Sequence, residues 1–416
     1  MNFKDLKIID PILEAIDEKG YKNPTKIQEQ AIPIVLKKKD VLGIAQTGTG
    51  KTGAFSMPII QLIYNHDGNT TRDKKLRALI ITPTRELAIQ IDENINEYNK
   101  YTHLRHAVIF GGVKQNKQVE KLKKGVQILV ATPGRLLDLI NQGYIRLDDI
   151  KIFVLDEADR MLDMGFIHDI KKLLKILPRK RQTLFFSATM PDHIISLSKN
   201  MLTNPERVEV ARKSSVVDTI QQRLYYTNKE DKVKLLHHIL KDIPNEQVLV
   251  FARTKHGADK LVKKLIKMGL KADAIHGNKS QNRRQNTLKN FKENKVKILV
   301  ATDIAARGID ISKLEYVVNF DLPNLPETYV HRIGRSGRAG EKGLAISISE
   351  PEENAYVRDI EKLIKKKIDK ISDHPFPQTD KPMTAAEKKE WNKEKQRKKK
   401  EFFEQRKKSK NNKRRR

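Results

Sequence analysis

Short continuous apolar runs, separated by stretches with helical spacing, constrain the fold of this 416-residue chain more than any other feature. Arg85–Tyr98 is one of the stretches with helical spacing. The apolar runs are Val41–Ile44, Ala78–Ile81, Ala107–Phe110, Ile128–Val130, Ile152–Leu155, Thr183–Phe186, Gln247–Phe251, Ala272–Ile275, Ile298–Val300, Tyr316–Phe320 and Gly343–Ser347. Strands that are apolar on both faces are typical of a parallel sheet with helices on both sides. The chain is therefore predicted to have an α/β fold.

One of these runs recurs almost unchanged in the second half of the chain. Val126–Thr132 (VQILVAT) is repeated as Val296–Thr302 (VKILVAT), 170 residues further on (302 − 132). Buried strands share Ile, Val and Leu, so convergence is one explanation. We favour two structurally related domains in tandem, with their boundary in 208–219. The predicted parts are domain 1 (1–210), domain 2 (218–371) and a basic, low-complexity, flexible tail (372–416).

The net charge of +31 predicts a polyanionic partner. Nucleic acid is the first candidate, and an anionic membrane surface is the second. Residues 381–416 hold 17 Lys and Arg against 5 Asp and Glu, so the rest of the chain is basic too. No apolar run approaches the length of about 18 residues that a membrane helix needs. Cysteine is absent, which fits a reducing compartment, so we expect a cytoplasmic protein.

A loop of small residues follows the first apolar run and precedes a helical stretch. Its residues are Ala45, Gln46, Thr47, Gly48, Thr49, Gly50, Lys51 and Thr52. In a strand–loop–helix of this kind, backbone N–H groups point into one concavity and bind phosphates. Lys51 can reach the terminal phosphates of a nucleotide, and Thr52 can offer its hydroxyl to Mg²⁺. Because the G-x-x-x-x-G-K-[ST] pattern begins with alanine here, a glycine-rich turn with a chance lysine is the alternative for this motif alone.

Two adjacent carboxylates follow the run Ile152–Leu155. Acidic residues at the carboxyl end of a parallel strand face the crevice where such sheets bind ligands. Asp156 can hold Mg²⁺ through water, and Glu157 can orient or deprotonate an attacking water as a catalytic base. Taken alone, the pair could equally be a helix cap with first-turn carboxylates.

The loop A-x-T-G-T-G-K-T and the literal D-E-A-D at 156–159 resemble the DEAD-box family of superfamily 2 RNA helicases. Alanine is the usual first residue of the loop in that family. Motifs in family order cover about residues 1–370. The resemblance implies two tandem RecA-like domains, ATP and Mg²⁺ as cofactors, and the bacterial RhlE-type group as the branch of the family.

Upstream of the loop, Gly20–Gln28 resembles the Q motif of the family, with Phe3 at the family's spacing. A glutamine amide can pair with the N6/N7 edge of adenine, so Gln28 implies ATP rather than GTP. Tyr21 offers a ring for stacking on the nucleotide. Without the resemblance, Gln28 would be interpreted as an ordinary surface glutamine.

Further segments resemble family motifs that track nucleic acid. They combine the backbone of a turn or helix start with a hydroxyl or a guanidinium, which suits phosphate contacts. Taken singly, each is explained equally well by turn and cap chemistry. Ser187 and Thr189 of S-A-T are implied to couple the ATP state to unwinding. The residues implied to bind RNA are Arg85, Gly111, Gly112, Thr132, Arg135, Arg253, Arg284, Thr302 and Gly308.

The run H-R-I-G-R-S-G-R matches the family's paired arginines. Arg335 and Arg338 are three residues apart, so a helix or turn presents both guanidinium groups on one side. Planar, permanent cations suit a γ-phosphate that gains charge in the transition state. His331 is grouped with them as catalytic, and Asp303 is implied to lie near the ribose of ATP. The alternative for the arginines is a solvated basic turn.

Together these features predict an ATP-dependent RNA helicase. RNA-stimulated ATP hydrolysis would be coupled to closure of the two domains and to local unwinding of short RNA duplexes. Single-stranded or short duplex RNA would bind with weak sequence preference, and ribosome or degradosome-type assemblies are candidate partners. The basic tail would tether structured RNA, unless it is merely a solubilising segment. An ATP-gated RNA clamp or annealing chaperone is the alternative, while a P-loop kinase or DNA translocase is disfavoured by the motifs occurring together.

Overall fold

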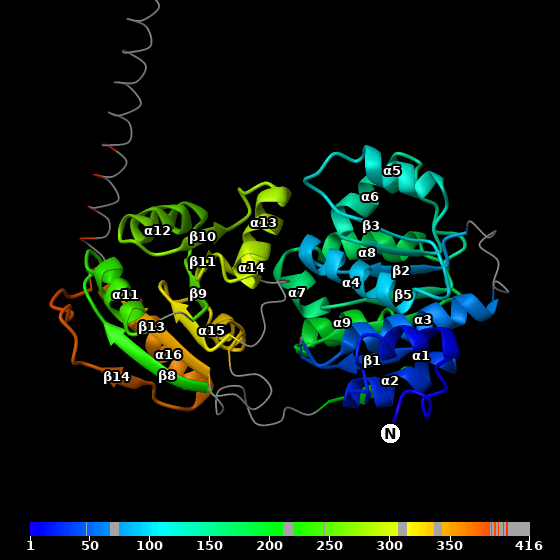
Figure 1. The fold of residues 1–416 in the computed structure, drawn as a ribbon, viewed down its shortest axis with the longest axis horizontal. Helices are drawn as coiled ribbons and strands as arrows, with labels where there is room; N and C mark the ends of the chain where they lie inside the picture. The colour runs from blue at the N-terminus through cyan, green and yellow to red at the C-terminus, as the bar shows by residue number, and fades with distance from the viewer. Residues whose placement is uncertain are drawn as a thin grey trace, which may run out of the picture. The chain divides into compact units, whose positions relative to one another are not determined.

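The computed structural model describes residues 1–46, 48–66, 75–210, 220–243, 246–306, 314–336 and 343–382, together with 384, 387, 390, 394 and 397. The chain divides into two compact units (Figure 1). Unit 1 contains the first seven-stranded sheet, and unit 2 contains the second. No helix within the described ranges is long and apolar enough to cross a membrane.

The strands of unit 1 form a parallel sheet in the order β3-β4-β2-β5-β6-β1-β7. Its central strands β2, β4 and β5 are buried along their whole length, as their continuous apolar sequences predict. The strands are β1 (Val41–Ile44), β2 (Ala78–Ile81), β3 (His106–Ile109), β4 (Ile128–Ala131), β5 (Ile152–Leu155), β6 (Gln182–Ser187) and β7 (Glu206–Glu209).

Helices cover both faces of this sheet and bury one hydrophobic cluster against each (Figure 1). The first cluster takes its helical residues from α1 (Asp10–Asp17), α2 (Lys26–Leu36), α3 (Lys51–His66) and α4 (Arg85–Tyr98). The second takes them from α5 (Asn116–Lys123), α6 (Pro133–Asn141), α7 (Ala158–Asp163), α8 (Ile167–Ile176) and α9 (Asp192–Lys199).

A glycine in β1 makes room for an aromatic ring on the neighbouring strand. A Cβ atom at Gly43 would lie 2.4 Å from two atoms of the Phe186 ring. Gly43 pairs with Phe186 in the β1–β6 register, and the ring is fully buried against that of Phe55. The strand that leads to the small-residue loop and the strand that ends in Ser187 therefore share one packed volume.

The strands of unit 2 also form a parallel sheet, in the order β10-β11-β9-β12-β13-β8-β14. They are β8 (Ile220–Tyr226), β9 (Val248–Phe251), β10 (Ala272–Ile275), β11 (Ile298–Ala301), β12 (Tyr316–Asn319), β13 (Gly343–Ser349) and β14 (Asp369–Ile371). The helices are α11 (Lys232–Lys241), α12 (Lys255–Lys267), α13 (Gln281–Lys292), α14 (Asp303–Ala306), α15 (Pro326–Ile333) and α16 (Asn354–Ile364), with the 3-10 turn η1 (Pro351–Glu353) before α16.

The two sheets have the same strand order. Each strand of unit 2 takes the place of the strand numbered seven lower in unit 1, so β8 corresponds to β1 and β12 to β5. The repeated sequence runs form β4 and β11, which are both second in their sheets. The expected α/β fold with two related parallel-sheet domains is therefore confirmed.

The segment after β14 continues to pack on unit 2. The His374 ring lies 5.6 Å from that of Tyr225, and the Phe376 ring lies 6.4 Å from that of His238. Asn228 Oδ1 accepts a hydrogen bond from the Thr379 N–H at 3.0 Å. These contacts extend beyond residue 372, where the sequence analysis expects the tail to begin. At the predicted boundary between the two domains, 208 and 209 belong to β7, while 211–219 lie outside the described residues.

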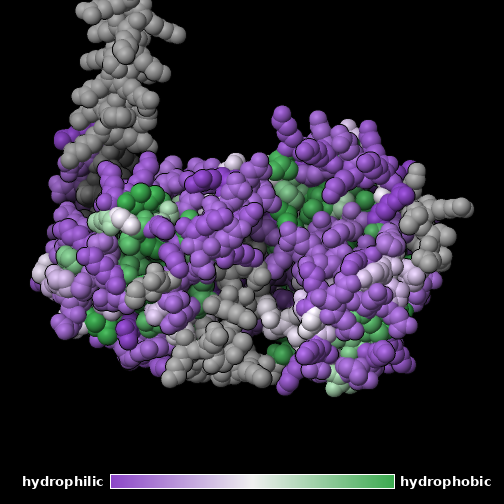
Figure 2. Space-filling model, in the orientation of Figure 1, coloured by the Kyte–Doolittle hydropathy of each residue, from purple (hydrophilic) through white to green (hydrophobic). Residues whose placement is uncertain are grey.

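Hydrophilic side chains cover most of the visible surface of each unit, with isolated hydrophobic spots between them (Figure 2). Among the described residues, the most exposed large apolar ones after Met1 are Leu325, at 65%, and Ile266, at 54%. Single exposed apolar residues of this kind are normal on a protein surface.

Candidate functional site

The small-residue loop connects β1 to α3, as its sequence predicts. The Ala45 N–H donates to the carbonyl of Ser187 at 3.0 Å, and the Thr49 hydroxyl donates to the carbonyl of Gln46 at 2.7 Å. Gly48 and Gly50 have φ angles of +83° and +98°, which glycine adopts without steric cost. Thr47 lies outside the described residues.

Lys51 begins α3 and is buried. Its ammonium group has no hydrogen-bond partner among the residues that the structure describes. The Asp156 carboxylate lies 3.9 Å away, and Thr52 follows in the first turn of the helix, half-buried. A buried ammonium group that makes no hydrogen bond is costly, so an anion such as a nucleotide phosphate fits this loop.

Asp156 and Glu157 follow β5 and are both buried. Burial raises the pKa of Asp156 to about 6, against the opposing effect of the Lys51 ammonium. Glu157 has a φ of +55°, a left-handed conformation that costs a non-glycine residue about 1–2 kcal/mol. Its carboxylate pairs with the Arg160 guanidinium one turn along α7. Strained backbone of this kind is commonly found at functional sites.

Gln28 lies against the same loop. Its Oε1 accepts a hydrogen bond from the Thr25 N–H at 2.8 Å, and its Nε2 donates to the carbonyl of Gly50 at 3.1 Å. A Cβ atom at Gly53 would lie 2.6 Å from that Nε2. The Q motif is thus in direct contact with the loop. In this structure the Gln28 amide forms its hydrogen bonds with protein backbone groups, not with an adenine base. Tyr21 is 39% exposed.

The S-A-T segment is joined to the D-E-A-D segment through Asp159, which the sequence analysis did not single out. The Asp159 carboxylate accepts hydrogen bonds from Thr189, and the Asp159 N–H donates to the Ser187 hydroxyl at 3.3 Å. The sequence signal that could have identified Asp159 is its position as the second aspartate of D-E-A-D.

Three segments predicted to contact RNA meet at the carboxyl ends of β2, β3 and β4. Arg85 begins α4. Its guanidinium packs so closely on Gly112 that a Cβ atom there would lie 2.2 Å from Arg85 Nη1. Arg135 of α6 donates from Nη2 to the carbonyl of Val113 at 3.1 Å. Gly111 lies in the same loop, and Thr132 caps α6. Two guanidinium groups and a glycine loop are therefore assembled from distant parts of the sequence.

The predicted residues of unit 2 lie at the carboxyl edge of its own sheet. Arg253 follows β9, Thr302 and Asp303 follow β11, and Arg284 is buried on α13. His331 is exposed on α15, and Arg335 is buried just after it. Gly308 and Arg338 lie outside the described residues.

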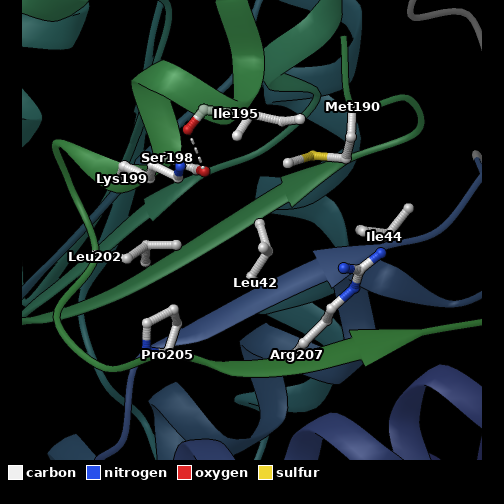
Figure 3. A pocket seen from close by; sticks show the side chains of 9 residues that line it. All are labelled: Leu42, Ile44, Met190, Ile195, Ser198, Lys199, Leu202, Pro205 and Arg207. Carbon is white, nitrogen blue, oxygen red and sulfur yellow. Dashed lines mark hydrogen bonds between the residues drawn. The ribbon is translucent and has the colours of Figure 1, made fainter. Parts of the chain in front are cut away.

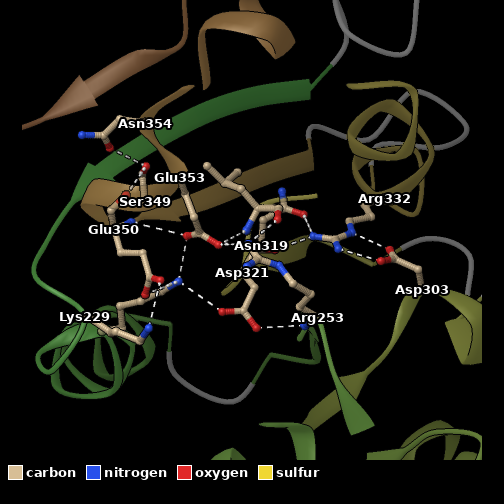
Figure 4. A network of polar contacts seen from close by, with 12 residues as sticks. Lys229, Arg253, Asp303, Asn319, Asp321, Arg332, Ser349, Glu350, Glu353 and Asn354 are labelled. Atoms are coloured by element: carbon tan, nitrogen blue, oxygen red, sulfur yellow. Dashed lines mark hydrogen bonds and ion pairs between the residues drawn. The ribbon is translucent and has the colours of Figure 1, made fainter. Parts of the chain in front are cut away.

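Arg332 was missed as a site residue, although it belongs to the H-R-I-G-R run. Its Nε and Nη2 donate to the two carboxylate oxygens of Asp303 at 2.6 and 2.8 Å (Figure 4). The guanidinium also lies 4.9 Å from the Phe251 ring, and the side chain is almost fully buried. Arg332 thus holds the carboxylate of Asp303, the residue implied to lie near the ribose, in a fixed orientation.

An apolar groove of 520 Å³ lies on the face of β1 that carries the Leu42 and Ile44 side chains (Figure 3). Leu42 and Ile44 of β1 form part of its lining, opposite Ile195 and Ser198 of α9. Met190, directly after Thr189, reaches its wall, but none of the predicted site residues lines it.

Comparisons with known proteins agree with this geometry. The family model described as DEAD/DEAH box helicase matches residues 25–197, and the helicase conserved C-terminal domain matches 231–340. The ATP-dependent RNA helicase CshA of Limosilactobacillus reuteri is 46% identical over 365 residues, which cover 87% of this chain and 72% of the relative. The chain belongs to the DEAD-box ATP-dependent RNA helicases.

Other relatives of this DEAD-box helicase lead to the same family. CshA of Geobacillus kaustophilus is 42% identical, over 89% of this chain and 78% of the relative. These relatives bear the name CshA, so the RhlE-type branch expected from the sequence is not supported. The structure of S. cerevisiae Dbp5 bound to RNA and ADP BeF3 is 32% identical and matches with a TM-score of 0.77, over 89% of this chain and 95% of that one. Each sheet, with its helices, is thus a RecA-like domain of a DEAD-box helicase.

Proposed function

We propose that this helicase hydrolyses ATP at the loop of unit 1 when RNA is bound, and that hydrolysis drives the separation of short RNA duplexes. The observation that carries the proposal is the buried ammonium of Lys51, which lies 3.9 Å from the Asp156 carboxylate and has no hydrogen-bond partner among the described residues. A triphosphate would supply the hydrogen-bond acceptors that this cation lacks. The names of the relatives favour helicase activity over an RNA clamp or annealing chaperone.

Four side chains of unit 1 have distinct tasks in this proposal. Lys51 would neutralise charge on the terminal phosphates, and the Thr52 hydroxyl and the Asp156 carboxylate would hold Mg²⁺, the latter through water. When bound, Mg²⁺ would supply Lewis-acid stabilisation of the phosphate oxygens. Glu157 accepts a proton from the attacking water, and one oxygen of its carboxylate is paired with the Arg160 guanidinium in the structure.

RNA binding in this proposal uses the loops at the carboxyl ends of β2, β3 and β4, where Arg85 and Arg135 lie beside the Gly111–Gly112 loop. The Dbp5 structure with bound RNA supports the same substrate class for this chain. Guanidinium and backbone groups contact phosphates rather than base edges, so binding would have weak sequence preference and strong salt dependence.

Hydrolysis would need both units, because Lys51 and Glu157 belong to unit 1 while Arg335 belongs to unit 2. We infer that Arg335 and Arg338 stabilise the charge that develops on the γ-phosphate when the units close on ATP and RNA together. One closed state would then link ATP affinity and RNA affinity reciprocally. The cytoplasmic location and the ribosome or degradosome-type partners stay predictions.

The experiment is steady-state ATP hydrolysis by the full chain with single-stranded RNA, with DNA of the same sequence and without nucleic acid. We expect strong stimulation by RNA and little by DNA. Glu157→Gln should lower the turnover number by a factor of about 10²–10⁴, as expected for loss of a general base. Asp163→Asn, at an exposed carboxylate of the same helix, is the matched control. Hydrolysis that is indifferent to RNA would contradict the proposed coupling.

A further inference from the structure

Unit 2 repeats the arrangement of Lys51 and Asp156 at the equivalent place. Lys51 begins α3, the first helix after β1, and Lys232 begins α11, the first helix after β8. β1 and β8 are both sixth in their sheets. Asp156 follows β5, Asp321 follows β12, and these strands are both fourth. The Lys232 ammonium lies 3.2 Å from the Asp321 carboxylate, where the corresponding distance in unit 1 is 3.9 Å.

The surroundings of the two lysines differ in one respect. Lys51 has no hydrogen-bond partner among the described residues, whereas the Lys232 ammonium donates to the Glu353 carboxylate at 2.9 Å. Glu350 lies 3.6 Å from the same ammonium. Both carboxylates come from the short segment that joins β13 to α16. Protein carboxylates thus fill, in unit 2, the position that would receive phosphates in unit 1.

The Lys232–Glu353 pair is almost completely removed from solvent, while the Asp321 side chain is 23% exposed. The side chains of Lys232 and Glu353 are 3% and 1% exposed. A buried ion pair contributes little net stability compared with apolar residues of the same volume, so its presence is not explained by stability alone. Its other contacts suggest what it does.

Glu353 and Asp321 also hold Arg253 (Figure 4). The second oxygen of Glu353 accepts a hydrogen bond from the Arg253 guanidinium, and Asp321 Oδ2 accepts one from the Arg253 N–H at 2.8 Å. The Arg253 side chain remains 40% exposed. An arginine predicted to contact RNA is therefore held at its backbone N–H and at Nη2, while part of its side chain faces solvent.

The same cluster reaches the predicted nucleotide side of unit 2. The backbone carbonyl of Asp321 accepts a hydrogen bond from Arg332 Nη1 at 2.6 Å, and Arg332 in turn holds both carboxylate oxygens of Asp303. A continuous set of polar contacts thus runs from Arg253 through Asp321 to Asp303.

We propose that Lys232, Glu353 and Asp321 form a closed counterpart of the phosphate site, which binds no nucleotide and instead positions Arg253 for RNA. These three are positioning residues for RNA-stimulated hydrolysis. The inference rests on the proposed function, because the contact of Arg253 with RNA belongs to it.

The test is Glu353→Gln in the full chain, which keeps the volume but removes the charge that holds Lys232 and Arg253. We expect the RNA concentration for half-maximal stimulation to rise about tenfold, while the turnover number at saturating RNA and the KM for ATP change less than about twofold. Arg253→Ala should raise the half-saturating RNA concentration by a similar factor, and the double variant should need no more RNA than either single variant.

Glu361→Gln is the matched control. Glu361 is a buried carboxylate of the same unit that also pairs with a lysine, Lys367 at 2.7 Å, and accepts a backbone N–H, that of Ile368 at 3.1 Å. It has no bond to Arg253 among those described, so its variant should retain the wild-type dependence on RNA. If Glu353→Gln folds poorly, Lys232→Met combined with Glu353→Met replaces the pair by apolar side chains. That variant should still require more RNA for half-maximal stimulation.

A purely structural role would lower the melting temperature but leave the half-saturating RNA concentration unchanged in folded protein, and this result would overturn the proposal. Binding of labelled single-stranded RNA is measured in parallel. If wild-type protein binds RNA but its ATP hydrolysis is not stimulated, the proposed function is contradicted. The RNA affinity of Glu353→Gln, compared with that of the wild type, would then still test the positioning of Arg253. Two bound nucleotides per wild-type chain would also overturn it.

Discussion

Asp159 Oδ2 accepts two hydrogen bonds from Thr189, one from its backbone N–H and one from its hydroxyl, each at 2.9 Å. The Ser187 hydroxyl closes the same turn by donating to the Thr189 carbonyl at 2.7 Å. The helix that begins after Glu157 is therefore tied to the end of β6. We expect a displacement of this turn to move Glu157, the proposed catalytic base, with it.

Replacing Thr189 by valine removes the hydroxyl bond and keeps the backbone bond. Loss of a hydrogen bond to a carboxylate should destabilise the protein by about 1.5–3 kcal/mol. We expect the number of duplexes separated per ATP hydrolysed to fall several-fold, with the KM for ATP unchanged, in a combined strand-displacement and hydrolysis assay. Ser198→Ala, which removes a hydroxyl bond to the Ile195 carbonyl in α9, should leave that ratio unchanged.

Gln28→Glu tests the contact between the Q motif and the phosphate loop. It keeps the acceptor for the Thr25 N–H but turns the donor toward Gly50 into an oxygen, so two oxygens would face each other. The dissociation constant for ATP should rise about tenfold, or about 1.4 kcal/mol, measured by calorimetry. Gln61→Glu is the control, because Gln61 likewise accepts one N–H and donates to one carbonyl, but beside the amino-terminal segment. An equal loss of ATP affinity in both variants would contradict the specific role of Gln28.

Gly112→Ala separates backbone strain from the position of Arg85. The new methyl group would collide with the guanidinium, and φ is +77°. Gly143→Ala, at φ +78° and with nothing within 4 Å, carries the same backbone cost without the collision. Both variants should lose about 1–2 kcal/mol of stability. Only Gly112→Ala should weaken binding of single-stranded RNA, by about tenfold in a fluorescence anisotropy titration.

Lys232 predicts a specific loss of stability at alkaline pH. Burial lowers the pKa of Lys232, but Glu353, Asp321 and Glu350 outweigh this effect and raise it above 10.5. A raised pKa means that the folded state binds the proton more tightly, so stability present below pH 10.5 is lost as the pH rises through the folded pKa. Lys232→Met should cost about 3–5 kcal/mol at pH 8.

That difference in unfolding free energy should shrink above pH 10.5, as urea titrations at each pH would measure. Lys241→Met, at an exposed position of the same helix, is the control and should have little effect at any pH. A difference that stays constant up to pH 12 would contradict the charged state assigned to the buried lysine.

Truncation of the basic tail should start after the segment that packs on unit 2. Removing 382–416 should weaken RNA binding and flatten its salt dependence, because phosphate-neutralising cations are lost. Removing 373–416 should also lower the melting temperature, since His374 and Phe376 are deleted with their ring contacts. Unchanged RNA affinity at low salt after the shorter deletion would eliminate the tethering role.

The ends of most strands are predicted from the sequence to within one residue. A strand buried on both faces is a continuous apolar run, and the polar loops on either side mark where it begins and ends. The prediction misses β7 and β14, which are the last strands of their sheets, and β8, which lies between β13 and β14. β8 reads IQQRLYY, with Gln221 exposed and Arg223 half-buried, and β7 buries one residue of four. In these strands polar residues interrupt the apolar run, and pairing with a strand distant in the sequence decides the structure.

Residue types and motifs also identify most of the candidate site, but not its connections. Lys232 has the sequence context of an ordinary exposed helix-start lysine, yet its partners lie 89 and 121 residues further on. The contact of Arg85 with Gly112 likewise joins the start of α4 to a loop that only the sheet brings near it. Such pairings depend on strand order, which no local pattern contains.

The close approach of Phe186 to Gly43 has a consequence for how this chain can vary. The ring occupies the volume that any side chain at position 43 would require, and both strands end at functional segments. A larger residue at 43 is tolerable only if position 186 becomes smaller at the same time. The two positions should therefore change in a correlated way, with Gly43→Ala rescued by Phe186→Leu, so that mutations accumulate here in pairs rather than singly.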